Sequence, residues 1–472
     1  MDIIKRMTWI IIGVWILFCL LTVNYNGPFF DESIYITAGE RTFEGHGYSD
    51  GYMTWFAGSL IWPVLAGLGY KLAGLAGTRI VAVLLSTATF VAVVQAADNL
   101  FGRKASFWTA VALALSGPFA SLARLGVYDV PALTGMAVSF WAVTALIKWD
   151  HRLWLLVAAV SFTLGMFSKY PMGMMLFPLL GVIFTQRRGK ALLDAGIFGL
   201  ISTAIVLVFF LPMRDQFSAL ASWQVINRPN FGVEVRTIGF ALFYLSLVPA
   251  VFALGGWFAA KGKRGLATVL LLSLAIWPAY HLLSGNPVGP NKHVVFGFLF
   301  AYPLVGLAFS TLWESPWGKA LLPKAAVLLS VAGLAVLGVV QLDQADRAWP
   351  DVRAASDYLL THVEPGELLL INESWPYTMY LYTEERIQSP WDVFDSYRVT
   401  HGESEIDLCD YDWFVDTQGS YAWPEPILDT IAGCDTFEEV YAMDSTVVGL
   451  GGNLNFVTYP IHTVIWKNVH EN

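Results

Sequence analysis

The sequence predicts a polytopic α-helical membrane protein with a small α/β domain at its C-terminal end. Of the 472 residues, 56% are hydrophobic and only 14% are charged, whereas a soluble domain carries about 25% charged residues. Apolar runs long enough to cross a bilayer recur between residues 7 and 342. From about Gln341 these runs stop, and charged residues, prolines and short alternating segments begin, as is typical of a small α/β domain.

Eleven apolar runs predict the transmembrane helices. They lie near residues 7–24, 79–98, 105–122, 131–148, 153–168, 171–186, 193–212, 238–260, 266–283, 294–312 and 322–342. The first run resembles a signal peptide, but it is longer than usual and no small-residue cleavage site follows, so we expect a retained helix. The 19 Trp and 19 Tyr suit the membrane interface, and the net charge of −9 argues against nucleic acid as a partner.

The segment 53–76 decides the predicted topology. If it crossed the bilayer, every later basic loop would lie outside, against the positive-inside rule. These loops contain Arg103 and Lys104, Lys148 and Arg152, Arg187 to Lys190, and Lys261 to Arg264. Pro63 and several glycines also weaken the segment as a helix. We therefore predict a juxtamembrane or re-entrant helix pair, a cytoplasmic N-terminus and an extracytoplasmic C-terminal domain, in the plasma (inner) membrane.

This topology divides the chain into a transmembrane domain, 1–342, with a first outer loop at 25–78, and an extracytoplasmic domain, 343–472. It places acids and cations together on the outer face. The acids are Asp31 and Glu32 in the first loop and Asp129 just before the span at 131–148. The cations are Lys169, Arg228, Lys292 and His293. Carboxylates at the rim of a bilayer are costly unless they serve chemistry.

Together these side chains predict group transfer from a lipid-linked phosphate. Asp31 could take the proton of an attacking hydroxyl. Asp129 could bind a divalent metal such as Mg²⁺ or Mn²⁺, with Asp31 as a second ligand, or could orient the acceptor. Lys169, Arg228, Lys292 and His293 could stabilise the charge that develops on a phosphate leaving group.

Each of these residues also has a structural interpretation. Asp31 could cap a helix that begins at Glu32. Asp129 could cap the span that follows it, or pair with Arg124. Lys169 could extend to lipid headgroups, and His293 could anchor the interface.

In the C-terminal domain, Asp351–His362 reads as an amphipathic helix, and Glu367–Ile371, Tyr411–Asp416 and Thr463–Lys467 read as strands. Cys409 and Cys434 both lie here, and an extracytoplasmic location would permit a disulfide between them. Cys19 lies within the first span, where we expect it to pack as a small apolar residue.

Short motifs spread over residues 25–310 carry a family resemblance. In chain order they are Phe30-Asp31-Glu32, Thr78-Arg79, Leu100 to Lys104, Leu115 to Pro118, Tyr128-Asp129-Val130-Pro131, Ser168-Lys169-Tyr170-Pro171, and Lys292-His293 followed by Tyr302-Pro303. Their order resembles that of the GT-C membrane glycosyltransferases, in particular the protein O-mannosyltransferase and aminoarabinose-transferase group.

The resemblance implies a polyprenyl-phosphate-sugar donor, a lipid, glycan or protein acceptor, and transfer with inversion at the outer face. It assigns the role of base or metal-site member to Asp31, with Glu32 secondary. One departure is the stretch Tyr48–Tyr52, which stands where the aminoarabinose transferases have a Lys-Pro-Pro segment. The alternatives are a transporter or flippase for a lipid-linked sugar and a non-catalytic scaffold. A transporter predicts repeated halves and charges at mid-membrane, whereas the acids here lie at span ends.

Overall fold

The computed structural model describes residues 3–46, 61–221, 235–285, 289–315, 321–395, 398, 407–417, 423, 425–434, 436–450 and 454–469. The chain forms two compact units. The helical unit contains Met1–Val23, Ser49–Trp62 and Arg79–Ala345, and the sheet unit contains Asn24–Tyr48, Pro63–Thr78 and Asp346–Asn472. Most of the predicted first outer loop, 25–78, thus groups with the C-terminal part of the chain.

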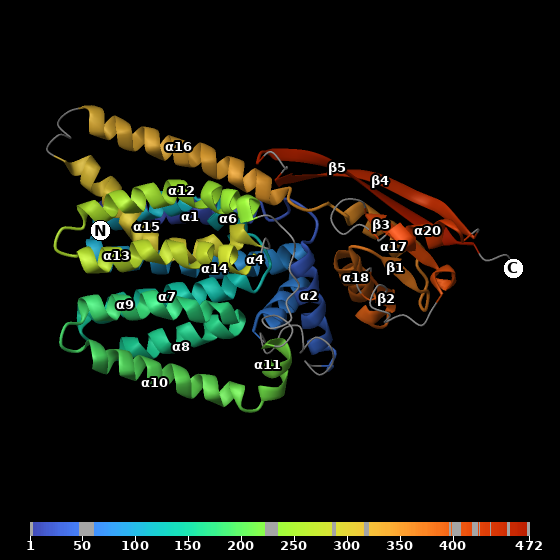
Figure 1. The fold of residues 1–472 in the computed structure, drawn as a ribbon, viewed down its shortest axis with the longest axis horizontal. Helices are drawn as coiled ribbons and strands as arrows, with labels where there is room; N and C mark the ends of the chain where they lie inside the picture. Colours follow the sequence, from blue (N-terminus) through green and yellow to red (C-terminus); the bar gives the residue numbers. More distant parts are fainter. Residues whose placement is uncertain are drawn as a thin grey trace. The chain divides into compact units, whose positions relative to one another are not determined.

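The helical unit is a bundle of long apolar helices that run alongside one another (Figure 1). In chain order its elements are α1 (Ile3–Leu21), α4 (Ile61–Phe101) apart from its Pro63–Thr78 stretch, α5 (Arg103–Ala114), α6 (Gly117–Ala123), α7 (Asp129–Trp149), α8 (Leu153–Ser168), η1 (Tyr170–Met175), α9 (Leu176–Gln186), α10 (Ala191–Phe210), α11 (Arg214–Ala221), α12 (Val235–Ala259), α13 (Arg264–Leu272), η3 (Ser273–Ala275), α14 (Ile276–Ser284), α15 (Pro290–Glu314) and α16 (Leu321–Asp346).

The apolar runs of the sequence coincide with these helices. Within the described residues, eight helices are long and apolar enough to cross a membrane, and the bent pair α5–α6 would make nine. Two shorter apolar helices, Leu153–Ser168 and Tyr170–Gln186, account for the remaining runs. The predicted run at 105–122 is not straight, because α5 and α6 meet at 71°. Ser116 causes the break: its hydroxyl accepts the Phe119 N–H and caps a new helix, with Pro118 in the first turn.

The chain reverses direction inside α4. Helical geometry is interrupted at Ala73 and at Gly74, where φ is +58°, a conformation that glycine adopts without strain. The Thr78 hydroxyl donates to the Ala66 carbonyl at 2.8 Å, although residues this far apart in a straight helix would lie about 18 Å apart. The segment before Ala73 is therefore a separate short helix. Of the helix pair predicted for 53–76, this short helix is the described part, and residues 53–60 lie outside the described residues.

Two buried arginines hold the end of α1. Arg79 and Arg124 donate to the carbonyls of Val23 and Thr22, at 2.8 and 3.0 Å. These two carbonyls directly follow the last residue of α1, at the helix end that carries partial negative charge, where a guanidinium group both donates hydrogen bonds and supplies positive charge.

An ion-pair network joins the ends of α7 to α10. Arg187 bonds Asp150 at 2.6 Å and Asp194 at 2.8 Å, and Arg152 also bonds Asp194 at 3.1 Å. Lys190 bonds Asp150 at 2.8 Å. The basic loops that the sequence places on one side of the membrane thus meet at one end of the bundle, which we call the basic end.

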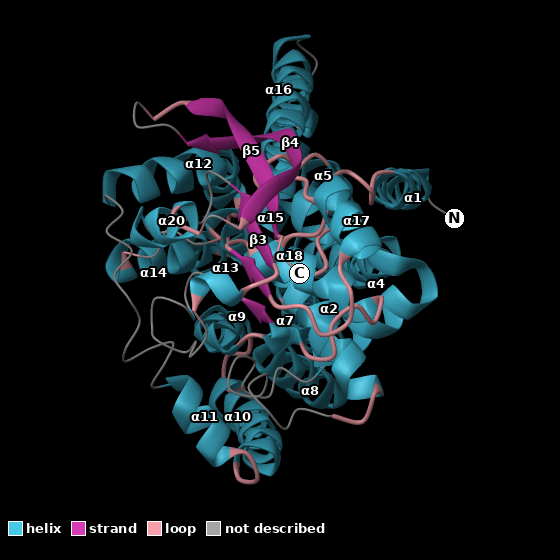
Figure 2. Ribbon diagram, turned by 90° about the vertical axis from the view of Figure 1, so that its right-hand side faces the viewer, coloured by secondary structure: helices cyan, strands magenta, loops and turns pink. Residues whose placement is uncertain are grey.

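The sheet unit contains a five-stranded sheet in the order β2-β1-β3-β5-β4 (Figure 2). Its strands are β1 (Leu369–Ile371), β2 (Val393–Phe394), β3 (Trp413–Thr417), β4 (Phe437–Leu450) and β5 (Phe456–Asn468). Its helical segments are α2 (Phe30–Phe43), α17 (Arg353–His362), α18 (Ser374–Thr383), η5 (Pro390–Asp392), η6 (Leu408–Asp410) and α20 (Glu425–Ala432). The first three strands are parallel, and β5 pairs antiparallel with both β3 and β4.

Alternation along the strands builds a core on each face of the sheet. Leu369 and Ile371 pack into one apolar cluster, together with residues of α17 and α18, while Leu370 packs into another that includes Ile427 of α20. Successive side chains of a strand point to opposite faces, so three consecutive apolar residues serve both cores. This explains why β1 reads as a continuous apolar run.

The predicted helix at 351–362 and the three predicted strands are confirmed in position. The long strand β4 was not predicted, because most of its side chains stay exposed or half-buried on both faces and leave no apolar stripe to recognise. The disulfide Cys409–Cys434 is present, with the Cα atoms 5.6 Å apart, and Cys19 is a buried free cysteine.

Candidate functional site

A buried ion pair lies where two helices of the bundle end. Asp129 is the first residue of α7, and Lys169 directly follows α8. The Lys169 ammonium bonds the Asp129 carboxylate, and the two residues are only 6% and 1% exposed. The position at the start of α7 favours the carboxylate, because a helix N-terminus carries partial positive charge. The Tyr128 ring lies 4.8 Å from the Lys169 nitrogen and adds a cation–π contact.

Two histidines extend this pair into a chain of hydrogen bonds. Nε2 of His293 lies 2.7 Å from the Lys169 nitrogen, and Nδ1 of His293 lies 2.8 Å from Nε2 of His281. An ammonium group can only donate, so Nε2 of His293 accepts and its ring proton resides on Nδ1. That proton is donated to His281, which is fully buried in α14. The four side chains form what we call the Asp129 cluster: Asp129, Lys169, His293 and His281.

The first turn of α15 and one tryptophan fix the imidazole of His293. The backbone N–H groups of Lys292 and His293 both bond the Gly289 carbonyl at 3.0 Å. The buried Trp277 ring packs against the His293 ring, with centroids 4.4 Å apart. Lys292 is itself buried beside His293. The predicted basic turn therefore presents both of its side chains inside the protein.

One oxygen of the cluster is left open. Oδ1 of Asp129 faces Lys169, with His293 3.8 Å away, whereas Oδ2 is buried without a hydrogen-bond partner among the described residues. A buried acceptor in this state is costly. It is therefore suited to a ligand that brings a hydroxyl or another donor.

The geometry excludes three of the structural interpretations. Asp129 does not cap α7, because Tyr128 holds the cap position. Arg124 does not serve as its partner, since the Asp129 carboxylate bonds Lys169 instead and Arg124 donates to the carbonyls of Ala120 and Thr22. Lys169 does not extend to headgroups, because its ammonium is buried in the ion pair.

Asp31 and Glu32 belong to the sheet unit, in the first turn of α2. The helix begins at Phe30, so Asp31 lies within it and is not its cap. Glu32 takes the capping role, since its Oε2 accepts the Phe29 N–H at 2.9 Å, and it is fully buried. The side chain of Asp31 is half-buried. The two neighbouring acids thus differ, because one completes the helix start and the other does not.

Contacts within the sheet unit hold α2 in place. It packs against α18, and the Tyr382 hydroxyl bonds the Glu44 carboxylate just after α2. Burial raises the pKa of the Glu40 carboxyl above its ordinary value, and the salt bridge to Lys71 at 3.0 Å opposes this rise. The helix that carries Asp31 is therefore anchored on the C-terminal domain.

Four of the predicted site residues, Asp129, Lys169, Lys292 and His293, thus lie together in the helical unit. Asp31 and Glu32 lie in the sheet unit, and Arg228 lies outside the described residues. His281 and Trp277 were not predicted from the sequence as site residues. Their signal was weak, because a single histidine in the apolar run Ile276–Ser284 is not distinguishable from a core residue.

The surroundings of Asp129 do not fit a hard divalent cation. Mg²⁺ and Mn²⁺ prefer several oxygen ligands, whereas Asp129 offers one open oxygen beside an ammonium group. The described residues also contain no group of three His, Cys, Asp or Glu side chains arranged to hold a metal. Metal binding by Asp31 and Asp129 stays a prediction.

The apolar bundle and the small sheet domain define a multi-pass membrane protein with the GT-C fold. The structure is similar to that of ArnT from Cupriavidus metallidurans bound to undecaprenyl phosphate, with a TM-score of 0.65, 16% identity and 97% of each chain covered. The mycobacterial arabinofuranosyltransferase AftD matches with a TM-score of 0.54 and 17% identity, over 99% of this chain and 42% of AftD.

The oligosaccharyltransferase of Archaeoglobus fulgidus matches with a TM-score of 0.54 and 11% identity, over 87% of this chain and 69% of that chain. In sequence, residues 59–214 match the family described as dolichyl-phosphate-mannose-protein mannosyltransferase. This stretch includes Asp129 and Lys169. No curated protein matches the chain.

Proposed function

We propose that the chain is a membrane glycosyltransferase that transfers a sugar from a polyprenyl-phosphate donor to a lipid, glycan or protein acceptor on the extracytoplasmic side, with inversion. The observation that carries this proposal is the Asp129 cluster, a buried carboxylate with one oxygen held by Lys169 and the other open. The match of residues 59–214 to mannosyltransferases that use dolichyl-phosphate-mannose supports it. So does the fold of ArnT, which was solved with undecaprenyl phosphate.

The proposed reaction is a single displacement. The acceptor oxygen forms a bond to the anomeric carbon while the bond from that carbon to the phosphate oxygen breaks. The carbon inverts, the polyprenyl phosphate leaves with the bonding electrons, and Asp31 takes the proton of the acceptor. Lys169 and Lys292 stabilise the charge that develops on the leaving phosphate. Asp129 holds Lys169 in position, and its open oxygen accepts a hydroxyl of the bound substrate.

Asp31→Asn tests this proposal. Losing a general base costs about 10²–10⁴ in rate, and asparagine preserves the size of the side chain. The measurement is sugar release from a polyprenyl-phosphate-sugar by the purified protein in lipid nanodiscs, with the unfolding temperature as a check of folding. Asp357→Asn is the matched control, because Asp357 is an exposed aspartate on α17 in the same unit.

We expect the Asp31 variant to unfold at the wild-type temperature and to lose nearly all turnover, while the Asp357 variant keeps it. Normal turnover in Asp31→Asn would eliminate Asp31 as the base. A wild-type protein that moves the intact donor across a vesicle membrane without breaking the sugar–phosphate bond would instead establish the transporter alternative.

A further inference from the structure

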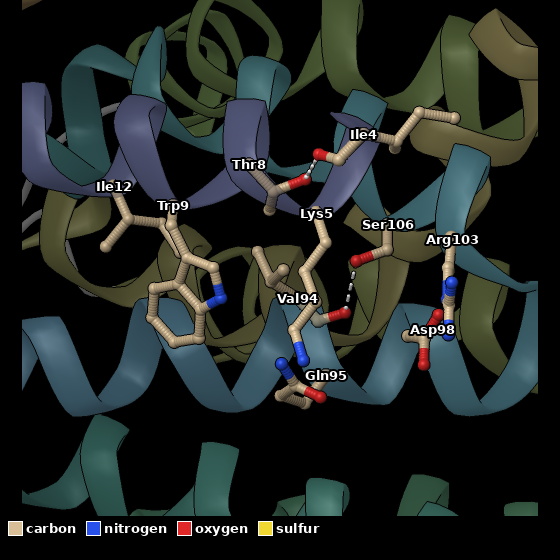
Figure 3. A pocket seen from close by; sticks show the side chains of 10 residues that line it. All are labelled: Ile4, Lys5, Thr8, Trp9, Ile12, Val94, Gln95, Asp98, Arg103 and Ser106. Carbon is tan, nitrogen blue, oxygen red and sulfur yellow. Dashed lines mark hydrogen bonds between the residues drawn. The ribbon is translucent and has the colours of Figure 1, made fainter. Parts of the chain in front are cut away.

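A polar cavity of about 110 Å³ opens at the basic end of the bundle (Figure 3). It lies between the first turns of α1, the last turns of α4 and the start of α5. Its polar lining consists of Lys5, Thr8, Gln95, Asp98, Arg103 and Ser106. The volume exceeds what one water molecule needs. The cavity is therefore large enough for a small polar group.

The lining offers a ligand positively charged groups, but no free hydroxyl donors. Thr8 donates to the Ile4 carbonyl and Ser106 to the Val94 carbonyl, so both hydroxyl protons are already used. Lys5 reaches into the cavity towards Gln95 (Figure 3). Among the described residues, no acidic partner bonds Lys5.

The remaining charges leave an excess of cations. Arg103 lies on the other side of the cavity, beside Asp98 (Figure 3). Asp98 also bonds Lys148 at 3.1 Å. The lining thus has two cations, Lys5 and Arg103, and one carboxylate that already pairs with Lys148, and the balance favours an anionic ligand.

The helix α1 lines the cavity with one face, and its opposite face suits hydrocarbon. One side of α1 carries apolar side chains that stay exposed along its whole length, namely Ile3, Met7, Ile10, Val14, Leu17 and Leu21. They recur every three or four residues and form one stripe. In a membrane protein such a stripe faces lipid tails. Trp9 lines the cavity and is 41% exposed, and tryptophan is common at membrane interfaces.

We propose that this cavity binds the phosphate headgroup of an anionic phospholipid from the membrane leaflet at the basic end, beside Trp9. Lys5 and Arg103 hold the phosphate, and Gln95 donates its amide N–H. The site is separate from the Asp129 cluster and does not rest on the proposed glycosyl transfer.

The experiment compares two double variants in nanodiscs. Lys5→Gln with Arg103→Gln removes both cations of the cavity. Arg6→Gln with Lys104→Gln removes the same charges from the neighbouring positions, which do not line the cavity. Native mass spectrometry counts retained phosphatidylglycerol against phosphatidylcholine, and the unfolding temperature in phosphatidylcholine alone confirms that both variants fold.

We expect retention of phosphatidylglycerol to fall about five-fold for each cavity charge removed and to stay near wild type in the control. Equal losses in both variants would overturn the proposal, because they would show general attraction to the basic end. Stabilisation of the wild type by inorganic phosphate alone, without anionic lipid, would also overturn it by assigning the cavity to a free anion.

Discussion

At the scale of single residues, the pairing of Asp129 with Lys169 decides what each of them can do. The carboxylate is 1% exposed and the lysine 6%, and ions taken out of water are stable only when their partners are well placed. Lys169 is also bound to His293, which in turn donates its Nδ1 proton to His281. A change at any of these positions therefore alters the orientation of the ammonium group that we propose faces the donor phosphate.

The ion pair of Asp129 and Lys169 predicts how variants at these two positions change the stability of the protein. Asp129→Asn and Lys169→Met should each destabilise the protein by about 3–5 kcal/mol, because each leaves an uncompensated buried charge. The double variant should lose much less than the sum, since it removes both charges. Unfolding of the three variants in the same detergent measures this. Strictly additive losses would mean that the pair is not coupled.

Asp150 makes a pH-dependent contribution at the basic end. Hydrogen bonds from Lys190 and Arg187 lower the pKa of its carboxyl from 3.8 to about 2. A lowered folded-state pKa means that the stabilisation is present above pH 3.8 and disappears as the pH falls towards 2. Asp150→Asn should therefore lower the unfolding temperature near neutral pH, and the difference from wild type should vanish over this acidic range.

Asparagine is the matched replacement at position 150. Asp150 ends α7 with φ at +52°, and asparagine tolerates this left-handed conformation. The variant thus tests charge without backbone strain. A difference that persists unchanged down to pH 2 would show that Asp150 acts through packing instead.

At the scale of elements, α2 and the short helix before Ala73 cross at two glycines. A Cβ atom at Gly39 would lie 2.1 Å from the Pro63 carbonyl oxygen, and one at Gly67 would lie 2.8 Å from the Gly39 backbone. The absence of side chains therefore permits the close contact that holds α2, and with it Asp31.

Gly39→Ala should destabilise the sheet unit, because overpacking costs about 1–3 kcal/mol and the obstacle here is rigid backbone. Gly196→Ala in α10 is the control, since nothing lies within 4 Å of its added Cβ and alanine favours a helix. Thermal unfolding should show a loss for the first variant and none for the second. Equal effects would contradict the proposed crossing contact.

At the scale of the whole molecule, the remaining prediction concerns the two sides of the membrane. Lys5 and Arg103 line one cavity, and Lys263 bonds the Leu100 carbonyl at 2.6 Å. The N-terminus and the basic loops thus share one end of the bundle, as the predicted topology requires. Asp129 begins α7, whose 21 residues place it about 30 Å from that end.

An engineered cysteine tests the orientation. Lys261→Cys should resist an impermeant thiol reagent in intact cells, because the basic end is predicted to face the cytoplasm, whereas Asp215→Cys should react. Asp215 is 88% exposed. The background is low, because Cys19 is buried and Cys409 and Cys434 form a disulfide. Labelling of position 261 and protection of position 215 would reverse the topology.

The sequence by itself determined the membrane class, the positions of the apolar helices and the change to an α/β domain near residue 342. These are local properties. A transmembrane helix requires a continuous run of apolar residues, and a strand places successive side chains on alternate faces of its sheet. It also singled out Asp129, Lys169, Lys292 and His293, since charged side chains at the ends of apolar spans stand out in a linear pattern.

Only the tertiary structure decided which of these residues meet. His281 enters the cluster, Glu32 caps α2, and α2 packs on α18 of the C-terminal domain. Each of these outcomes depends on a side chain's partners and burial. The bonds that join Lys169 to Asp129 and to His293 span 40 and 124 residues of sequence. Such contacts arise from the packing of whole helices, which no local pattern in the chain encodes.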